Sequence, residues 1–97
     1  VARSLYLWSE NPDTQLLASI EGGSIFEVTA SEGAKGVNRT VKDVSDMKDM
    51  LYIAIRRGGK LIIPSGNVTF MPGDVITVFT KKESEGRSVE YMDELFH

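Results

Sequence analysis

The sequence has no cysteine among its 97 residues, and this absence excludes disulfide bonds, thiolate metal sites and a cysteine nucleophile. It also has a single histidine, His97, at the last position. A terminal side chain is usually frayed, so we do not expect this imidazole to bind a metal or to act in catalysis. The lack of cysteine fits a protein of a reducing compartment.

Positive charge and long hydrophobic runs are also scarce. There are 11 Lys and Arg residues against 14 Asp and Glu, for a net charge of −3, whereas a nucleic-acid surface depends on clustered cations. The opening residues VARSLYLWSENP reach Glu10 before any long apolar run, so no signal peptide is visible. We therefore expect one soluble domain with one modest core. Because the first residue is not methionine, we expect the sequence to be a piece of a longer protein, with removal of the initiator methionine as the alternative.

Two short helices are predicted before the first strand. The apolar residues within positions 1–9 have the spacing of one helix face, and Pro12 would stop that helix. Asp13 can cap a second helix, which Gly22 would close with a positive φ. We interpret residues 1–21 as the helical tail of a preceding domain, or as a linker. The apolar residues of the second helix are Leu16, Leu17 and Ile20.

The next segments predict a strand and a third short helix. Residues 24–30 alternate between two sets of side chains with a period of two, which is typical of a strand with one buried face. Val37, Val41 and Val44 then recur at helical spacing, which predicts a short amphipathic helix.

Two apolar runs, residues 51–57 and 60–63, are separated only by Gly58 and Gly59. This dipeptide readily adopts the paired positive φ angles of a two-residue turn, so the sequence predicts a β-hairpin. In the first run, Leu51, Ile53 and Ile55 are expected to share one side of the strand.

A second reversal and a final helix complete the expected elements. Pro72 and Gly73 stand where a type II turn requires them, and residues 75–80 form a further strand after it. The tail, residues 83–97, is charged and offers Ser88 as a helix cap. The apolar face of that helix consists of Val89, Met92, Leu95 and Phe96.

Residues that could carry chemistry are few, and we do not expect an enzyme. Asp43, Asp46 and Asp49 recur every three residues, but the lysines between them favour a solvated face over an acid pair or a cation site. Lys35 and Arg39 flank a glycine-containing loop and could form an anion site, with an ordinary turn as the alternative. A basic cluster at the predicted hairpin either protects a sheet edge or binds a phosphate. That cluster consists of Arg56, Arg57 and Lys60.

The stretch LYIAIRRGGKLIIPSGNVTFMPGDVITVFTKK resembles the TrkA-C domain, also called the RCK C-terminal domain, of potassium-transport regulators. The order of an Ile-rich strand, Arg, Gly, a strand ending in Pro, then Gly-Asp and a Val-rich strand carries the resemblance. It extends upstream through the strand IFEVTA, the GAKG loop and VNRTVKDV, and so covers about residues 22 to 80. The residues of the structural motif are Gly58, Gly59, Pro64, Pro72, Gly73 and Asp74.

The resemblance implies an α+β fold, a small β-α-β-β-α-β sandwich with a mainly antiparallel sheet and short helices. The helix expected between Pro64 and Pro72 is reduced to a few residues here. We accordingly divide the chain into a tail (1–21), a TrkA-C-like regulatory domain (22–82) and a C-terminal charged segment with a short helix (83–97).

The resemblance also implies a function. Similar domains act as noncatalytic, ligand-sensing regulators on the cytosolic side of potassium transporters and channels, form homodimers, and in some cases bind a cyclic dinucleotide between the subunits. We expect no cofactor or metal in these residues, a cyclic dinucleotide or another nucleotide as effector, and a membrane transporter or channel subunit as partner. By their chemistry, Val37, Asn38, Arg39 and Arg56 are the candidate ligand-binding residues.

An alternative interpretation comes from the segments GKLIIP and PGDVITVF, which also resemble the swapped-hairpin DNA-binding barrels of the AbrB type. That resemblance covers only about twenty residues and lacks the longer helical connection of those proteins. The net negative charge also counts against it, because DNA binding draws on clustered cations. We therefore expect no nucleic-acid partner.

Overall fold

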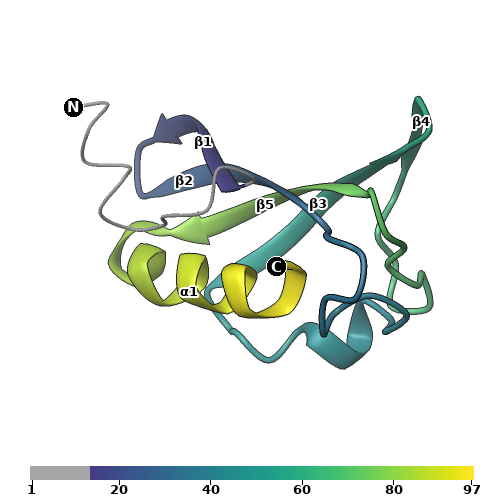
Figure 1. Ribbon diagram of the computed structural model, residues 1–97. Helices are drawn as coiled ribbons and strands as arrows, with labels where there is room; N and C mark the ends of the chain where they lie inside the picture. The colour runs from purple at the N-terminus through teal and green to yellow at the C-terminus, as the bar shows by residue number, and fades with distance from the viewer. Residues whose placement is uncertain (1–13) are drawn as a thin grey trace.

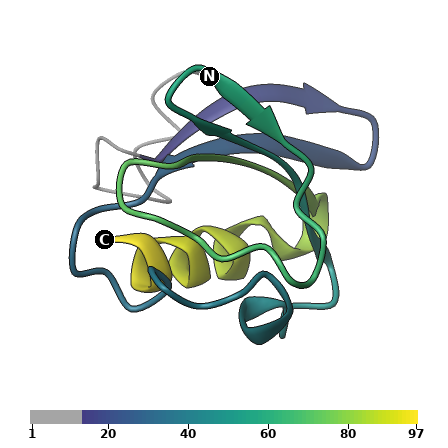
Figure 2. The same ribbon diagram turned by 90° about the vertical axis from the view of Figure 1, so that its right-hand side faces the viewer.

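The computed structural model describes residues 14–97, and these form one antiparallel sheet with a helix across one face (Figure 1). The five strands lie in the order β1-β2-β5-β3-β4. Helix α1 (Glu85–Phe96) and the loop that carries the 3-10 helix η2 (Lys42–Val44) lie on the same side of the sheet (Figure 2). The strands are β1 (Thr14–Ile20), β2 (Gly23–Thr29), β3 (Met50–Arg57), β4 (Lys60–Ile62) and β5 (Val75–Lys81), and a second 3-10 helix, η3 (Lys82–Ser84), precedes α1.

The prediction of a helix over residues 14–21 is wrong, because these residues form β1, which pairs antiparallel with β2. A β-bulge between Leu16 and Ala18 interrupts the strand alternation, so the apolar positions acquire a spacing that resembles a helix face. Gly22, with φ of 87°, turns the chain between the two strands. The helix expected within positions 1–9 lies outside the described residues.

The core lies between the sheet and α1. In β2, alternation buries Phe26 and Val28, as the sequence predicts for this strand, and in β5 it buries Ile76 and Val78. These side chains pack in one cluster with the buried residues of α1. Burial of that cluster is the main source of stability, at about 25 cal/mol per Å² of apolar surface.

The expectation that Leu51, Ile53 and Ile55 share one side of β3 is wrong. Leu51 is 63% exposed and Ile53 is 40% exposed, whereas Ile55 is fully buried. A bulge between Tyr52 and Ala54 shifts the alternation by one residue, so Met50 and Tyr52 point inward before it and Ile55 points inward after it.

Both predicted reversals are confirmed. Gly58 and Gly59 have φ angles of 56° and 83°, and they join β3 to β4 in an antiparallel hairpin. Gly73 has φ of 87°, and the Asp74 amide donates to the Met71 carbonyl oxygen at 3.1 Å, as in a type II turn.

The helix predicted across Val37, Val41 and Val44 is reduced to the single 3-10 turn η2. All three valines are buried, but Asn38 adopts φ of 72°, which no helix can continue through. The backbone from Asn38 to Lys42 instead bonds to residues 66–70, with a β-bridge between Thr40 and Thr69. Of the two helices of a β-α-β-β-α-β order, the first is therefore one turn and the second is a loop.

Helix α1 begins three residues before the predicted cap. Ser88 lies inside the helix, is fully buried, and shares a hydrogen bond of 2.6 Å with Thr80 of β5. The predicted apolar face is confirmed, since Val89, Met92, Leu95 and Phe96 are all buried. The architecture is the expected α+β class with a mainly antiparallel sheet.

Candidate functional site

The candidate ligand residues of the sequence lie on the loop between β2 and η2, which is held against the end of α1. The amides of Ser31 and Gly36 donate to the carbonyl oxygens of Phe96 and Leu95, at 2.8 and 2.6 Å. These carbonyls lie in the last turn of the helix and have no partner within it, so the loop satisfies them. The end of α1 therefore fixes the loop in place.

Gly36 allows this close approach. A Cβ atom at this position would lie 2.9 Å from the Phe96 ring and 3.0 Å from the Leu95 carbonyl oxygen. Both distances are shorter than ordinary contacts, so a side chain here would push the loop from the helix. Glycine is required here by packing, since its φ is not among the positive values.

The next three residues place two polar side chains at the surface over an apolar anchor. Val37 is buried, whereas Asn38 and Arg39 are exposed. The Asn38 amide donates to the Phe70 carbonyl oxygen at 2.8 Å, and the Phe70 amide donates to the Arg39 carbonyl oxygen at 2.9 Å. Below this pair, the Phe70 ring packs edge-on against Phe96, with centroids 5.0 Å apart. A rigid backbone thus displays an amide and a guanidinium to solvent.

The fourth candidate, Arg56, has a different environment. Its side chain is 57% exposed and donates to Glu27 of β2 at 2.6 Å. Because successive side chains of a strand point to opposite faces, Arg56 and Arg57 leave β3 on opposite sides. Within residues 14–97, no hydrogen bond or ion pair joins Arg56 to the loop that carries Asn38 and Arg39.

Arg57 is the arginine that reaches the neighbouring loop. Its guanidinium contacts both carboxylate oxygens of Asp74 at 2.8 Å and also donates to the Thr69 carbonyl oxygen at 2.8 Å. Asp74 is fully buried, and its carboxylate also accepts the Met71 amide at 2.9 Å, so it fixes the Pro-Gly turn. The hydrogen bond to Asp74 raises the pKa of Arg57.

This network is one that the sequence reasoning only partly found. It placed Arg57 in a basic cluster for edge protection or phosphate binding, and it named Asp74 only as a residue of the structural motif. The available signal was the order Arg-Gly-Gly followed by Pro-Gly-Asp, which places one arginine and one carboxylate beside two consecutive reversals.

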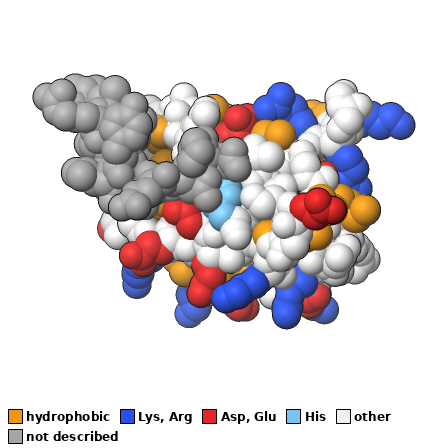
Figure 3. Space-filling model, in the orientation of Figure 1, with side chains coloured by type: hydrophobic (Ala, Val, Ile, Leu, Met, Phe, Trp, Pro, Cys, Tyr) orange, Lys and Arg blue, Asp and Glu red, His pale blue; other side chains and the backbone are white. Residues whose placement is uncertain are grey.

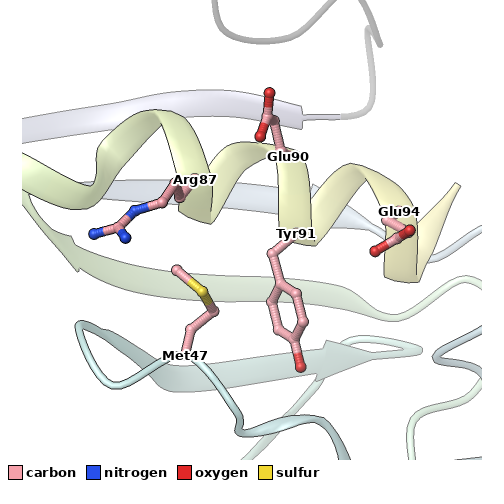
Figure 4. Close-up of a pocket in the computed structure, with 5 residues that line it drawn as sticks. All are labelled: Met47, Arg87, Glu90, Tyr91 and Glu94. Carbon is pink, nitrogen blue, oxygen red and sulfur yellow. The ribbon is translucent and has the colours of Figure 1, made fainter.

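A hollow that the sequence did not predict lies between α1 and the loop before β3 (Figure 4). It has a volume of about 330 Å³ and is lined by Met47, Arg87, Glu90, Tyr91 and Glu94. In Figure 4 the Met47 and Tyr91 side chains lie on the same side of α1, between the helix and the neighbouring segment. Partial burial raises the pKa of Tyr91. The lining of the hollow carries one cation, Arg87, and two carboxylates, Glu90 and Glu94.

The three spaced aspartates do not gather into a cation site. Asp43 and Asp46 are exposed, and Asp49 accepts a hydrogen bond of 2.7 Å from Ser84, which lowers the pKa of that carboxyl. No group of three or more potential ligands occurs in residues 14–97. The same residues include no helix long and apolar enough to cross a membrane.

The terminal residue His97 contacts both ends of the described chain. Its imidazole lies 2.7 Å from the Thr14 hydroxyl, and Thr14 donates to Asp93 at 2.8 Å. The contact joins the start of β1 to the end of α1. In Figure 3 the pale blue imidazole lies beside acidic side chains.

The comparison with protein families decides the assignment. The model of the TrkA-C domain matches residues 25–91, which run from within β2 through β5 and include more than half of α1. The chain belongs to the TrkA-C domain family.

A curated relative agrees with this assignment. The TrkA-C domain described here is 33% identical over 82 residues to a Trk system potassium uptake protein TrkA homolog of Archaeoglobus fulgidus. That alignment covers 84% of this chain but only 18% of the relative, so the chain spans less than a fifth of that protein's length.

The structural neighbours share the fold at low sequence identity. One is an RCK_C domain dimer of S. agalactiae BusR in complex with c-di-AMP, with a TM-score of 0.58 and 19% identity, covering 71% of this chain and 95% of that one. Another is the GsuK RCK domain, with a TM-score of 0.63 and 15% identity, covering 81% of this chain and 18% of that one.

These findings confirm the family and the fold that the sequence predicted. Together they place the chain in the TrkA-C domain family, with a fold shared with RCK_C domains. The AbrB-type interpretation receives no support. The TrkA-C match covers residues 25–91, and not only the two segments that resemble the AbrB type.

Proposed function

We propose that this TrkA-C domain is a ligand-sensing, dimerising and noncatalytic regulatory domain of a potassium transporter or channel system. It would work in the cytoplasm, at the inner face of the membrane, through its transporter. The observation that carries the proposal is the loop at the end of α1, which displays Asn38 and Arg39 from a backbone hydrogen-bonded to Phe70. A fixed loop with an exposed amide and an exposed guanidinium is suited to binding a ligand through hydrogen bonds and charge.

The effector that fits this loop best is a cyclic dinucleotide. The Arg39 guanidinium can pair with a phosphate through two parallel hydrogen bonds, and the Asn38 amide can both donate to and accept from a base or a ribose. Val37 anchors the loop from below because it is buried. The complex of the S. agalactiae BusR RCK_C dimer with c-di-AMP supports this choice of ligand.

Calorimetry with c-di-AMP, ATP and a nicotinamide nucleotide tests the proposal. We expect c-di-AMP to bind, and Arg39→Ala to weaken the binding by about tenfold to a hundredfold, since a hydrogen bond to a charged group contributes about 1.5–3 kcal/mol. Lys82→Ala is the matched control, because Lys82 is also exposed but lies in η3, before the start of α1. No binding across the panel would leave only a role in assembly.

Arg56 requires a separate measurement, because its guanidinium already pairs with Glu27. If a phosphate displaces Glu27, Glu27→Gln should strengthen ligand binding and Arg56→Ala should weaken it. If both variants bind the ligand as tightly as the unchanged chain, Arg56 is not part of the binding site. That result would not affect the assignment of Asn38 and Arg39.

The transporter partner is either a separate subunit or another part of the same longer chain. In cells that depend on the parent protein for potassium uptake, Arg39→Ala should abolish the response of uptake to the effector while leaving protein levels unchanged. If uptake in that variant still responds normally to the effector, ligand binding at Arg39 does not control transport.

A further inference from the structure

The hollow between α1 and the loop before β3 takes no part in the proposed function. Its lining does not include Asn38 or Arg39, to which the effector is assigned. Its volume of about 330 Å³ lies at the lower end of the range for small-molecule sites, which is about 300–1,000 Å³. The hollow is therefore a separate candidate site for a small ligand or for a single side chain.

Helix periodicity places the lining residues of α1 along one stripe. Arg87, Tyr91 and Glu94 are separated by four and three residues, so they lie on one side of the helix. In Figure 4, Tyr91 lies between Arg87 and Glu94, and Met47 reaches toward α1 from the loop before β3. With a rise of 1.5 Å per residue, the ends of the stripe are about 10 Å apart. A ligand here can therefore be elongated.

The wall of the hollow is apolar and electron-rich. Tyr91 contributes an aromatic ring and Met47 a thioether, and both side chains are half-buried. Both also pack against the hydrophobic core, which holds them in place. The face of an aromatic ring attracts cations, and a thioether adapts its shape to an alkyl chain. These two groups fit a ligand with a methylene chain and a cationic end.

The charges around Tyr91 are mainly negative. Glu90 and Glu94 line the hollow. Burial is the largest cause of the raised pKa of Tyr91, and the negative charges of Asp46 and Glu94 raise it further, against a backbone hydrogen bond at Asp46. Charges that oppose a phenolate at this position attract a cation to it.

Two basic side chains near the hollow leave this negative charge available. Arg87 donates to the Ser84 hydroxyl at 3.1 Å, which holds its guanidinium toward the start of α1. Lys35 approaches Glu94 at 3.9 Å, but the two side chains are 73% and 65% exposed, and such a pair contributes little. A ligand cation can therefore displace Lys35 from Glu94.

Other classes of ligand fit the hollow less well. An anion would lie beside the carboxylates of Glu90 and Glu94, which repel it. Within residues 14–97, no three or more His, Asp or Glu side chains are placed to hold a metal ion. An organic cation satisfies both the carboxylates and the apolar wall.

We propose that the hollow binds an alkylammonium group, with the cation between the Tyr91 ring and the Glu94 carboxylate and the methylene chain on Met47. The group belongs either to a free amine or to a lysine side chain of another protein, because both present the same atoms. The proposal is independent of the proposed function, since the loop of Asn38 and Arg39 does not line the hollow.

An NMR titration of the isotopically labelled 97-residue chain tests the site. The probes are butylammonium, N-acetyl-lysine methylamide and, as the uncharged control, butanol. We expect saturable shifts of the Met47 methyl group and the Tyr91 ring with an ammonium probe, and roughly fivefold weaker binding of butanol. Equal binding of butanol, or no shifts with either ammonium probe, would overturn the proposal.

The two ammonium probes distinguish the sources of the group. If the blocked lysine binds at least as tightly as butylammonium, the hollow takes a lysine side chain of a protein. If the blocked lysine binds much more weakly, the hollow takes a free amine, because the peptide groups of the blocked lysine do not fit.

Glu94→Gln tests the charge without a change of shape, and should weaken binding of butylammonium roughly fivefold. Glu83→Gln is the matched control, because Glu83 is also an exposed glutamate but lies in η3 and does not line the hollow. Circular dichroism on each variant verifies that it folds. Equal affinities of the two variants would contradict the role of Glu94.

Two further variants test the position of the cation. Lys35→Ala should strengthen binding of butylammonium, because it removes the competitor for Glu94. Tyr91→Phe should retain most of the affinity, because the ring and not the hydroxyl attracts the cation. An unchanged or lower affinity in Lys35→Ala would contradict the placement of the cation at Glu94.

The outcome is separable from that of the proposed function. In the same NMR experiment, c-di-AMP should shift the signals of Asn38 and Arg39 and not those of Met47 and Tyr91. Binding of c-di-AMP without binding of an amine would overturn this inference alone. Binding of an amine without binding of c-di-AMP would uphold it and count against the proposed effector.

Discussion

The two adjacent arginines of β3 have the same chemistry in different environments. Arg57 pairs with the fully buried Asp74, whereas Arg56 pairs with Glu27 at the surface. Removing the partner of a buried carboxylate leaves an unpaired charge in the interior, which is costly, while exposed pairs contribute little. The local sequence cannot distinguish the two residues, since only the twist and pairing of the strands decide which side faces the turn.

Arg57→Ala should therefore lower the free energy of unfolding by about 2–3 kcal/mol, a value below that of a fully buried pair because the Arg57 side chain is 38% exposed. Arg56→Ala is the control and should cost less than about 1 kcal/mol. Urea unfolding monitored by circular dichroism measures both. Equal losses in the two variants would contradict the structural role assigned to Arg57.

Because of the buried hydroxyl of Tyr52, we expect the folded domain to lose stability in alkali. Its hydroxyl donates to the Val44 carbonyl oxygen at 2.6 Å, and burial raises its pKa well above the ordinary value. The folded state thus holds the proton longer than the unfolded state. The contribution of Tyr52 is fully present below the unfolded pKa, about pH 10, and declines above it by about 1.4 kcal/mol per pH unit.

Tyr52→Phe provides the comparison, measured by urea unfolding from pH 8 to pH 11. The variant should be less stable at pH 8 by about 1 kcal/mol, because the Val44 carbonyl loses its donor, and its stability should fall less steeply above pH 10. Tyr91, whose pKa is also raised, accounts for part of the remaining slope. Parallel slopes for the two proteins would show that Tyr52 does not resist deprotonation.

At the scale of the elements, glycine positions show how the loop and α1 constrain each other. Gly36→Ala should destabilise the domain by about 1–3 kcal/mol, because its Cβ would meet the Leu95 carbonyl oxygen and the Phe96 ring. Gly86→Ala should be neutral or stabilise by up to about 1 kcal/mol, since α1 has open space around Gly86. Thermal unfolding distinguishes them, and a stable Gly36→Ala variant would argue against the close contact.

The turns and strands also show which features the sequence pattern predicts correctly. The hairpin at Gly58-Gly59 and the turn at Gly73 were predictable because positive φ angles have a strong local preference for glycine. The faces of β1 and β3 were not, because a bulge shifts the alternation without leaving a residue type that marks it. For the same reason, Leu16, Leu17 and Ile20 resembled a helix face.

At the scale of the whole molecule, α1 belongs to the same core as the strands. Val89, Met92 and Phe96 are fully buried within the cluster that includes Phe26 and Phe70. Deleting residues 85–97 should therefore remove the cooperative unfolding transition and expose apolar surface. Circular dichroism and binding of a hydrophobic dye measure this, and a truncated chain with an unchanged unfolding transition would contradict a single core.

The sequence also predicted only part of the candidate site. The sequence identified Asn38 and Arg39 by their chemistry, and the structure displays both at the surface of one loop. It grouped Arg56 with them, but strand alternation places that side chain beside Glu27 of β2. It did not find the hollow along α1, because residues 47 and 87–94 are brought together only by packing of the helix against the loop before β3.

The sequence by itself determined the family, the α+β class, the two glycine reversals and the polar loop, because each depends on residue type and order over a short span. Only the tertiary structure decided which faces are buried, which arginine holds Asp74, and that residues 14–20 join the sheet. These outcomes depend on bulges and on contacts between residues far apart in the chain, whose energies no local pattern contains.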